Sequence, residues 1–294
     1  MRLGRLIVPI FFALSVLASP TLSVAQMSVS ITVGVAPPPI PVYAQPPIPD
    51  EGYLWVPGYW AWERQGYYWV PGTWVHPPEA GLLWTPGYWE FAGNAYRWHP
   101  GYWGPQVGYY GGINYGFGYF GIGFVGGFWD HDAFRYNAAV NNFGSRRIKN
   151  VYRQTPANVG TSRAAFAGGR GGTARQPSAE DQRAVTQQRR EPTAPQIQQE
   201  RAAGTYRTQN ATVNHARPPV AATPRPGQFS GPGVTPARSP AAARQAPAAH
   251  AAPAAPQAHP APAARRQAPE ARPAPPAGGN RQGPAQDKDR RPGG

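Results

Sequence analysis

Four copies of one short aromatic phrase fill residues 52–103 and constrain the fold more than any other feature of the chain. Each copy holds a tryptophan, a Pro-Gly pair and a second tryptophan within six residues. The first tryptophans of successive copies are 14, 15 and 14 residues apart. A fixed phrase at a fixed period indicates that one supersecondary unit is repeated. The motif residues are Trp55, Gly58 and Trp60; Trp69, Gly72 and Trp74; Trp84, Gly87 and Trp89; and Trp98, Gly101 and Trp103.

Turn-forming segments separate the four phrases, so each phrase is expected to lie within one strand. The segments 63–66, 77–81 and 93–94 are polar or rich in glycine and proline. They divide the block into aromatic runs of about nine residues. The pattern predicts a mainly β fold, in which four aromatic-rich antiparallel strands form a meander over roughly 53–62, 67–76, 82–91 and 96–105.

The Pro-Gly pair inside each phrase needs its own explanation. Trp55 and Trp60 are five residues apart, so in a regular strand they would face opposite sides of the sheet. A β-bulge with glycine at positive φ would return both to one side. A Pro-Gly type II turn, in contrast, has the wrong twist for a tight hairpin. We therefore predict a Pro-Gly bulge in each strand, which leaves one face as a continuous aromatic ladder.

The ladder needs a second layer, because a sheet with one aromatic face must bury that face. The opposite face becomes more polar along the chain and ends with Arg97, His99 and Tyr102. Within the Gly- and aromatic-rich segment 104–145, residues 104–129 carry no charge, and we expect them to pack on the ladder. Two alternatives stay open for this stretch: a glycine-spaced membrane helix and an exposed, self-associating segment.

The N-terminus is typical of an export signal. Residues 1–25 combine Arg2 and Arg5, an apolar run over 6–18 and small residues before Gln26, where we expect the mature chain to begin. A retained anchor is the alternative, but an apolar run of this length is too short to span a bilayer. Alternating residues over 26–36 predict a strand, and seven prolines within 37–49 predict an extended linker over 37–51.

Charge and cysteine content exclude several classes. The chain has no cysteine, which rules out disulfides, thiol catalysis, cysteine-based zinc sites and a lipid anchor on cysteine. Residues 26–145 hold three basic and seven acidic residues, whereas 146–294 hold 23 basic and seven acidic ones. Such a basic segment attracts anionic partners. Beyond a weak strand within 137–152, we expect 146–217 to be partly helical or disordered, with helices beginning near Ser178 and over 194–203. Residues 218–294 are rich in Pro, Ala and Arg and predict disorder.

The phrases resemble those of the bacterial YXWGXW (WXXGXW) repeat proteins. Tyr53, Tyr67 and Tyr96 stand two places before a motif tryptophan, as in that family, although the third repeat has Leu82 there. The resemblance covers residues 52–103 and extends more loosely into the Gly- and aromatic-rich stretch that follows. It implies an exported protein, and it brings no catalytic residues, metal ligands or cofactor-binding residues to carry over.

Two short segments outside the repeats are candidate sites. Asp130-His131-Asp132 could ligate a metal, but adjacent residues do not converge on one ion and no second histidine cluster is near. Gly168-Gly-Arg170-Gly-Gly172 resembles a unit that binds nucleic acid without sequence preference, although an export signal argues against that partner. His76 and His99 are interpreted as packing or surface residues.

These observations predict an exported, non-enzymatic structural or interaction protein of the bacterial envelope or secretome. We expect a location in the periplasm, the outer envelope or the extracellular space, with no transmembrane span after signal removal. The basic tail would bind anionic envelope polymers or lipid head groups. The alternative hypothesis is a carbohydrate-binding module that stacks glycans on exposed repeat tryptophans. The chain lacks Gly-x-Ser-x-Gly, His-Glu-x-x-His and phosphate-loop motifs, so no enzyme, metal or cofactor is predicted.

Overall fold

The repeat block forms eight short strands, because every predicted long strand is interrupted at its Pro-Gly pair. The computed structural model describes residues 31–157 and 159–239. Its strands and helices confirm the predicted mainly β class. The strands of the repeat block are β2 (Leu54–Val56), β3 (Tyr59–Glu63), β4 (Gly66–Val70), β5 (Gly72–Val75), β6 (Leu83–Thr85), β7 (Tyr88–Ala92), β8 (Ala95–His99) and β9 (Tyr102–Gly104).

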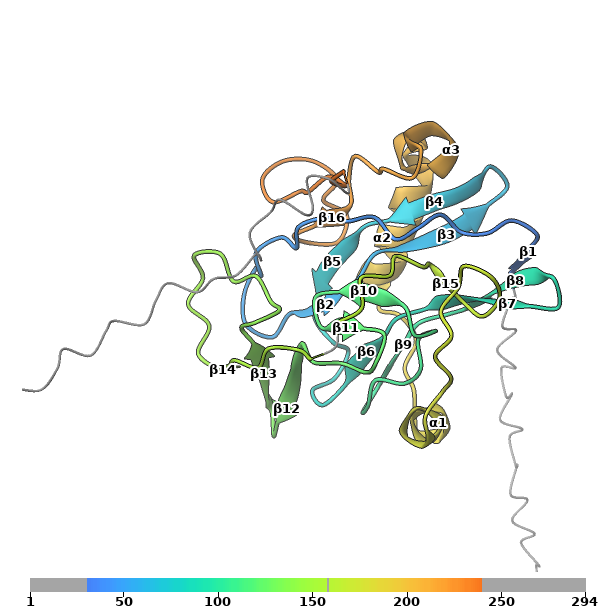
Figure 1. Cartoon of the computed structure of the whole chain (residues 1–294). Helices are drawn as coiled ribbons and strands as arrows, with labels where there is room; N and C mark the ends of the chain where they lie inside the picture. Colours follow the sequence, from blue (N-terminus) through green and yellow to red (C-terminus); the bar gives the residue numbers. More distant parts are fainter. Residues whose placement is uncertain (1–30, 158, 240–294) are drawn as a thin grey trace, which may run out of the picture. The chain divides into compact units, whose positions relative to one another are not determined.

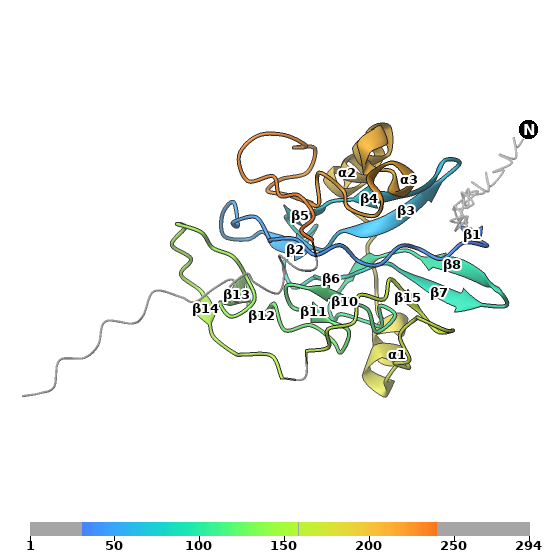
Figure 2. The ribbon, with the colours of Figure 1, turned by 45° about the horizontal axis from the view of Figure 1, so that its top comes forward.

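These strands pair as two separate hairpins, which corrects the predicted meander. In hairpin A (residues 54–75), β2 pairs with β5 and β3 with β4, all antiparallel. In hairpin B (residues 83–104), β6 pairs with β9 and β7 with β8 in the same way. No ladder joins β5 to β6 within the described residues. Figures 1 and 2 show the two hairpins side by side, with the tips of β3–β4 and β7–β8 at the same end.

The register shows that the predicted bulges are wrong. In hairpin A, Val56 pairs with Thr73 and Tyr59 pairs with Val70, so the interruption spans two residues on each strand. Neither strand carries an extra residue, because the two breaks lie opposite each other. Each motif tryptophan therefore faces another motif tryptophan directly across its hairpin: Trp55 and Trp74, Trp60 and Trp69, Trp84 and Trp103, and Trp89 and Trp98.

The segment predicted as a linker is part of the core. Residues 37–49 contain no helix or turn, as expected, and a bend and turn follow at 50 and 51, but Ile40, Tyr43 and Ile48 are buried. The stretch lies along the hairpins because its free carbonyls accept hydrogen bonds from indoles: Trp60 donates to Pro39 and Trp74 donates to Pro46. The strand expected over 26–36 is shorter in the structure, where β1 (Thr32–Val33) pairs with β8. Residues 26–30 and the predicted export signal lie outside the described residues.

The Gly- and aromatic-rich segment supplies the second layer, as predicted. Tyr110, Ile113 and Tyr119 are almost completely buried in the same core as the repeat tryptophans. The segment is strand and turn rather than helix, and no helix in the described part of the chain is long and apolar enough to cross a membrane. Its strands are β10 (Asn114–Gly116), β11 (Tyr119–Phe120), β12 (Gly127–Asp130) and β13 (Ala133–Asn137), followed by β14 (Val151–Tyr152) within the predicted region 137–152.

The basic half of the chain folds over the hairpins further than expected. Helix α1 (Ala179–Thr186) begins at a capping box formed by Ser178 and Asp181, at the predicted start. Helix α2 spans Ala194–Thr205 and is followed by the 3-10 turn η1 (Arg207–Gln209) and by α3 (Ala211–Asn214). Two strands of two residues each join distant ladders in parallel: β15 (Phe166–Ala167) pairs with β7, and β16 (Ala222–Thr223) pairs with β5.

The predicted disorder of residues 218–239 is wrong. Strand β16 pairs with the edge of β5 that faces away from β2, and so becomes the third strand of that sheet. This position leaves no exposed surface on Ala221, Ala222 and Thr223. Residues 240–294, the rest of the predicted disordered tail, lie outside the described residues.

Candidate binding surfaces

The repeat tryptophans form the core of the protein rather than an open platform. Seven of the eight are at most 5% exposed, which removes the exposed stacking face that the carbohydrate hypothesis required. The eighth, Trp98, is half-buried and stacks on Tyr59 of the other hairpin, with ring centroids 5.2 Å apart. Burial of such large rings is a main source of stability. The motif residues therefore act here as a scaffold.

The four motif glycines are needed for close approach and not for positive φ. None of them is among the residues with positive φ. A Cβ on Gly58 would lie 2.4 Å from an indole carbon of Trp69 and 2.8 Å from the backbone nitrogen of Gly72. The other three positions repeat this geometry, with an indole carbon at 2.4–2.6 Å from the added Cβ: Gly72 against Trp55, Gly87 against Trp98 and Gly101 against Trp84.

Segments outside the repeats complete this core by accepting hydrogen bonds from the indoles. The Trp69 indole donates to the carbonyl of Ala221 at 2.9 Å, and the Trp103 indole donates to Oε1 of Gln196 at 2.8 Å. Between the hairpins, the Trp89 indole donates to the carbonyl of Trp60 at 2.8 Å. A buried N–H without a partner is destabilising, so the repeats depend on residues far along the chain.

The polar face of hairpin B carries a cavity of about 340 Å³. Aromatic and charged groups from the hairpin and from α1 form its walls. Tyr88 stacks on His99 with centroids 4.6 Å apart, and the guanidinium of Arg189 lies 4.2 Å from the ring centroid of Tyr102. In hairpin A the corresponding face is mostly apolar, with Val56 and Val70 buried. The walls of the cavity include Thr85, Tyr88, His99, Tyr102, Tyr109 and Arg189.

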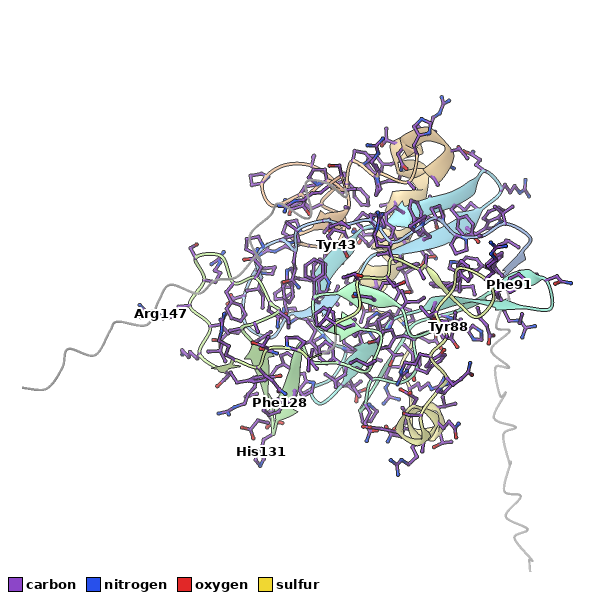
Figure 3. All side chains as sticks on the ribbon, viewed as in Figure 1. Tyr43, Tyr88, Phe91, Phe128, His131 and Arg147 are labelled. Atoms are coloured by element: carbon purple, nitrogen blue, oxygen red, sulfur yellow. The ribbon has the colours of Figure 1, made fainter. Side chains whose placement is uncertain are left out.

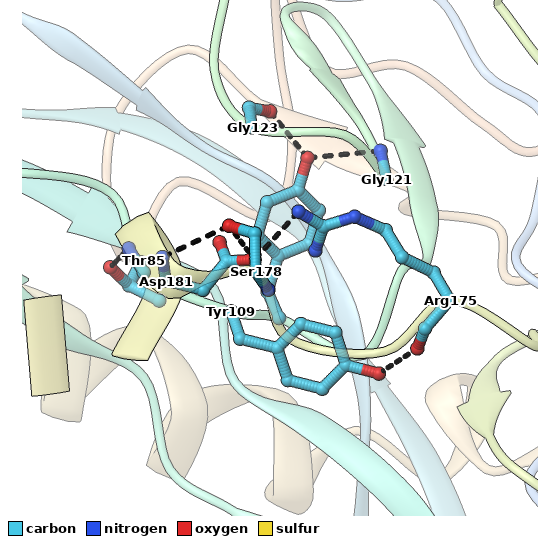
Figure 4. Close-up of polar contacts among 9 residues, drawn as sticks. Thr85, Tyr109, Gly121, Gly123, Arg175, Ser178 and Asp181 are labelled. Carbon is cyan, nitrogen blue, oxygen red and sulfur yellow. Dashed lines mark hydrogen bonds and ion pairs between the residues drawn. The ribbon is translucent and has the colours of Figure 1, made fainter. Parts of the chain in front are cut away.

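Two carboxylates beside this cavity, those of Glu90 and Asp181, are paired with basic side chains. His99 Nε2 lies 2.9 Å from a carboxylate oxygen of Glu90. Arg175 donates to Asp181 at 2.6 Å, and the same carboxylate oxygen also accepts from the backbone and hydroxyl of Ser178 (Figure 4). Burial raises the pKa of Tyr88 above the ordinary value of 10.0. Carboxylates that are already paired in this way suit binding better than proton transfer.

The sequence alone does not reveal this cavity. Its pattern places His99 on the polar face, where a packing or surface role was expected. The charged partners, Arg175, Asp181 and Arg189, lie more than 70 residues downstream. The increase in polarity along the predicted sheet face is the available signal, because a face covered by an apolar layer would stay apolar.

A cluster of basic residues occupies the segment that joins β13 to β14. Arg146, Arg147 and Lys149 are exposed, and within the described residues their side chains form no ion pair. Figure 3 shows Arg147 at the outer edge of the described fold. Phe128, on neighbouring β12, is also 44% exposed. An exposed cationic cluster is a surface that suits anionic partners.

The two candidate segments outside the repeats have structural explanations. Asp130 binds the ring of His131 at 3.0 Å and Arg135 at 3.1 Å, and within the described residues no three potential ligands converge to hold a metal ion. The glycine-rich stretch 168–172 is a turn, closed by backbone hydrogen bonds that Thr173 makes with Phe166 and with residue 168. Arg170 is exposed at its tip.

Comparison with known proteins identifies the two hairpins. The family model described as the WXXGXW repeat matches twice, at residues 52–75 and 81–103. The first match spans hairpin A and the second spans hairpin B up to residue 103, so in this chain each match holds two phrases that fold as one hairpin. No curated protein and no solved structure matches the chain.

Proposed function

We propose that this WXXGXW repeat protein is an exported, non-enzymatic interaction protein of the bacterial envelope or secretome. Its basic C-terminal part would bind anionic envelope polymers or lipid head groups. The observation that carries the proposal is the separation of charge. Residues 146–239 hold fifteen basic and four acidic residues, whereas 31–145 hold three basic and seven acidic ones. Charge collected on one part of a folded chain attracts oppositely charged surfaces over long range.

The exposure of this charge supports the proposal. Twelve of the fifteen basic residues between 146 and 239 are exposed, so they can reach a partner without unfolding. Two of the other three, Arg175 and Arg190, form ion pairs with Asp181 and Glu79. Export is supported by the signal-like residues 1–25. The paired state of His99 and Asp181 in the hairpin B cavity favours a binding role over catalysis.

The test is binding of the chain from Gln26 onward to vesicles of phosphatidylcholine, with and without phosphatidylglycerol, at increasing salt. Replacing Arg146 and Arg147 together by glutamine should weaken binding to the anionic vesicles. Each basic residue near an anionic surface contributes about 1 kcal/mol, so the double variant should lose roughly 30-fold in affinity at low salt. Added salt should reduce binding of the unchanged chain.

The matched control replaces Arg64 and Arg97, which are exposed and carry the same charge but lie on the hairpins. That pair should change the affinity little. If both double variants lost the same affinity for anionic vesicles, the binding would depend on the net charge of the chain and not on Arg146 and Arg147 in particular. Equal binding to neutral and anionic vesicles would overturn the proposal.

A further inference from the structure

A groove of about 580 Å³ lies on the side of the hairpins covered by the Gly- and aromatic-rich layer. Its volume falls within the range of about 300–1,000 Å³ that is typical of small-ligand pockets. Three segments form it: residues 40–43, β10 with the turn that follows, and residues 161–163. The lining includes Tyr43, Asn114, Tyr115, Phe117, Thr161 and Arg163.

Two tyrosines of the groove are fixed by the repeat glycines. The hydroxyl of Tyr43 accepts a hydrogen bond from the backbone N–H of Gly58, at 3.3 Å, in hairpin A. The hydroxyl of Tyr115 donates to the carbonyl of Gly87, at 2.7 Å, in hairpin B. These backbone groups are available because the Pro-Gly pairs interrupt the ladders. Tyr43 thus ties the groove to hairpin A, and Tyr115 ties it to hairpin B. These two bonds make the floor of the groove rigid before any ligand binds.

Phe117 is held in an unusual conformation at the groove. Its φ is +51°, between Gly116 at +76° and Gly118 at +97°. A bulky residue in the left-handed region is strained, and such strain persists where the surrounding structure fixes it, commonly at binding sites. The ring is half-buried and lies 5.3 Å from that of Tyr43, which Figure 3 labels, and 5.6 Å from that of Trp55. It therefore contributes a fixed aromatic surface to the groove.

Arg163 has the only charged side chain in the groove lining, among the residues that the structure describes. Its Nε donates to the carbonyl of Ile40 at 2.8 Å, and the Ile40 N–H donates to the carbonyl of Arg163 at 2.9 Å. These bonds fix the guanidinium, which forms no ion pair within the described residues. Partial burial lowers the pKa of Arg163, because it removes part of the water around the charge. A carboxylate can supply that counter-ion through two parallel hydrogen bonds to a guanidinium.

We propose that this groove binds an acidic sugar unit of a glycan, with the sugar carboxylate on Arg163 and the face of the sugar ring on Phe117. Thr161 also lines the groove, and its hydroxyl can bind sugar hydroxyls. The amide of Asn114, held in place by its bond to the carbonyl of residue 160, can do the same with its second N–H. The inference rests on the proposed function, because it names one class of anionic polymer and gives it a site. The site differs from the exposed-tryptophan platform, since it uses none of the motif tryptophans as a stacking surface.

In the experiment, the chain from Gln26 onward is titrated with trigalacturonate, a short uronic acid oligosaccharide, and calorimetry measures the heat of binding. Galactotriose, which lacks the carboxylates, is the ligand control. A salt concentration of about 0.5 M suppresses binding to exposed arginines, because it screens their attraction for anions. The expected result is that trigalacturonate binds, that galactotriose does not, and that Arg163→Gln and Phe117→Leu each weaken binding at least tenfold.

Two further variants keep the test decisive. Thr161 is exposed, so Thr161→Trp should leave the fold intact while it fills the groove and prevents binding. The double variant Arg146→Gln, Arg147→Gln should bind the oligosaccharide like the unchanged chain. Wild-type affinity in both Arg163→Gln and Thr161→Trp would overturn the site. If the oligosaccharide fails but binding to anionic vesicles persists, the inference fails and the proposed function stands; loss of both overturns both.

Discussion

Gly58 and Gly72 lie against each other across hairpin A, and each also lies against a tryptophan of the opposite strand. We predict that Gly58→Ala destabilises the protein by about 1–3 kcal/mol or more, as expected for overpacking. The added methyl would lie 2.4 Å from the Trp69 ring, which is completely buried, and 2.8 Å from a backbone nitrogen, so neither neighbour can move away easily. Urea unfolding followed by tryptophan emission measures the loss.

Gly34→Ala is the control for this substitution. Gly34 has no positive φ, and a methyl group added to its Cα would have no neighbour within 4 Å. The substitution should therefore be neutral within a few tenths of a kcal/mol. Equal effects of the two substitutions would show that Gly58 is not a close-approach position.

The sequence indicated that these glycines matter but suggested the wrong reason. The spacing of Trp55 and Trp60 favours a bulge if one strand is considered alone. In the structure the partner strand carries the same phrase, and its own Pro-Gly pair lies opposite the first. Because the two interruptions have the same length, the paired strands stay in register on both sides of them. The sequence of a single phrase does not contain this information.

At the scale of elements, a helix start could be predicted from its local sequence, whereas pairings between distant segments could not. The Ser178 and Asp181 pair marked the start of α1, because a capping box is encoded within four residues. Strand β16 has two residues, Ala222 and Thr223, and no alternating pattern. Its pairing depends on β5, about 150 residues earlier in the chain, so composition alone predicted disorder there. The groove and the hairpin B cavity were missed for the same reason.

We predict that a chain that ends at Arg217 loses most of its stability. The Ala221 carbonyl accepts from both the Gly72 N–H and the Trp69 indole, and Thr223 bonds to Gln199 and Thr73. Truncation leaves these buried groups without partners, at roughly 1–3 kcal/mol each. Their sum approaches the total stability of about 5–15 kcal/mol that is typical of a domain. Thermal unfolding by circular dichroism measures the difference.

A chain that ends at Ser239 is the matched comparison, because it keeps all of these contacts. It should unfold at the temperature of the full chain. If the chain ending at Arg217 is equally stable, the carbonyl of Ala221 does not contribute to the repeat core as described.

For the molecule as a whole, buried tyrosines should make stability fall steeply in alkali. Burial raises the pKa of Tyr43, Tyr59, Tyr110, Tyr115 and Tyr119 above the ordinary value of 10.0. The folded state therefore favours the neutral phenol, while the unfolded chain ionises near pH 10. Their contribution is complete below that pH and is lost above it. Each ionisation costs about 1.4 kcal/mol per pH unit, so five cost about 7 kcal/mol per unit.

The free energy lost over one to two pH units is therefore comparable with the total stability of a domain. We predict one cooperative unfolding step between roughly pH 10 and 12. Tyrosinate absorbance and the red shift of tryptophan emission should change together, because the tyrosines pack in one core with the repeat tryptophans. Tyr119→Phe should make stability less dependent on pH above 10, since one ionisable core group is gone. Tyr206→Phe should not, because that ring is 47% exposed. Smooth tyrosine titration near pH 10 with unchanged tryptophan emission would mean that the two layers do not form a single cooperative core.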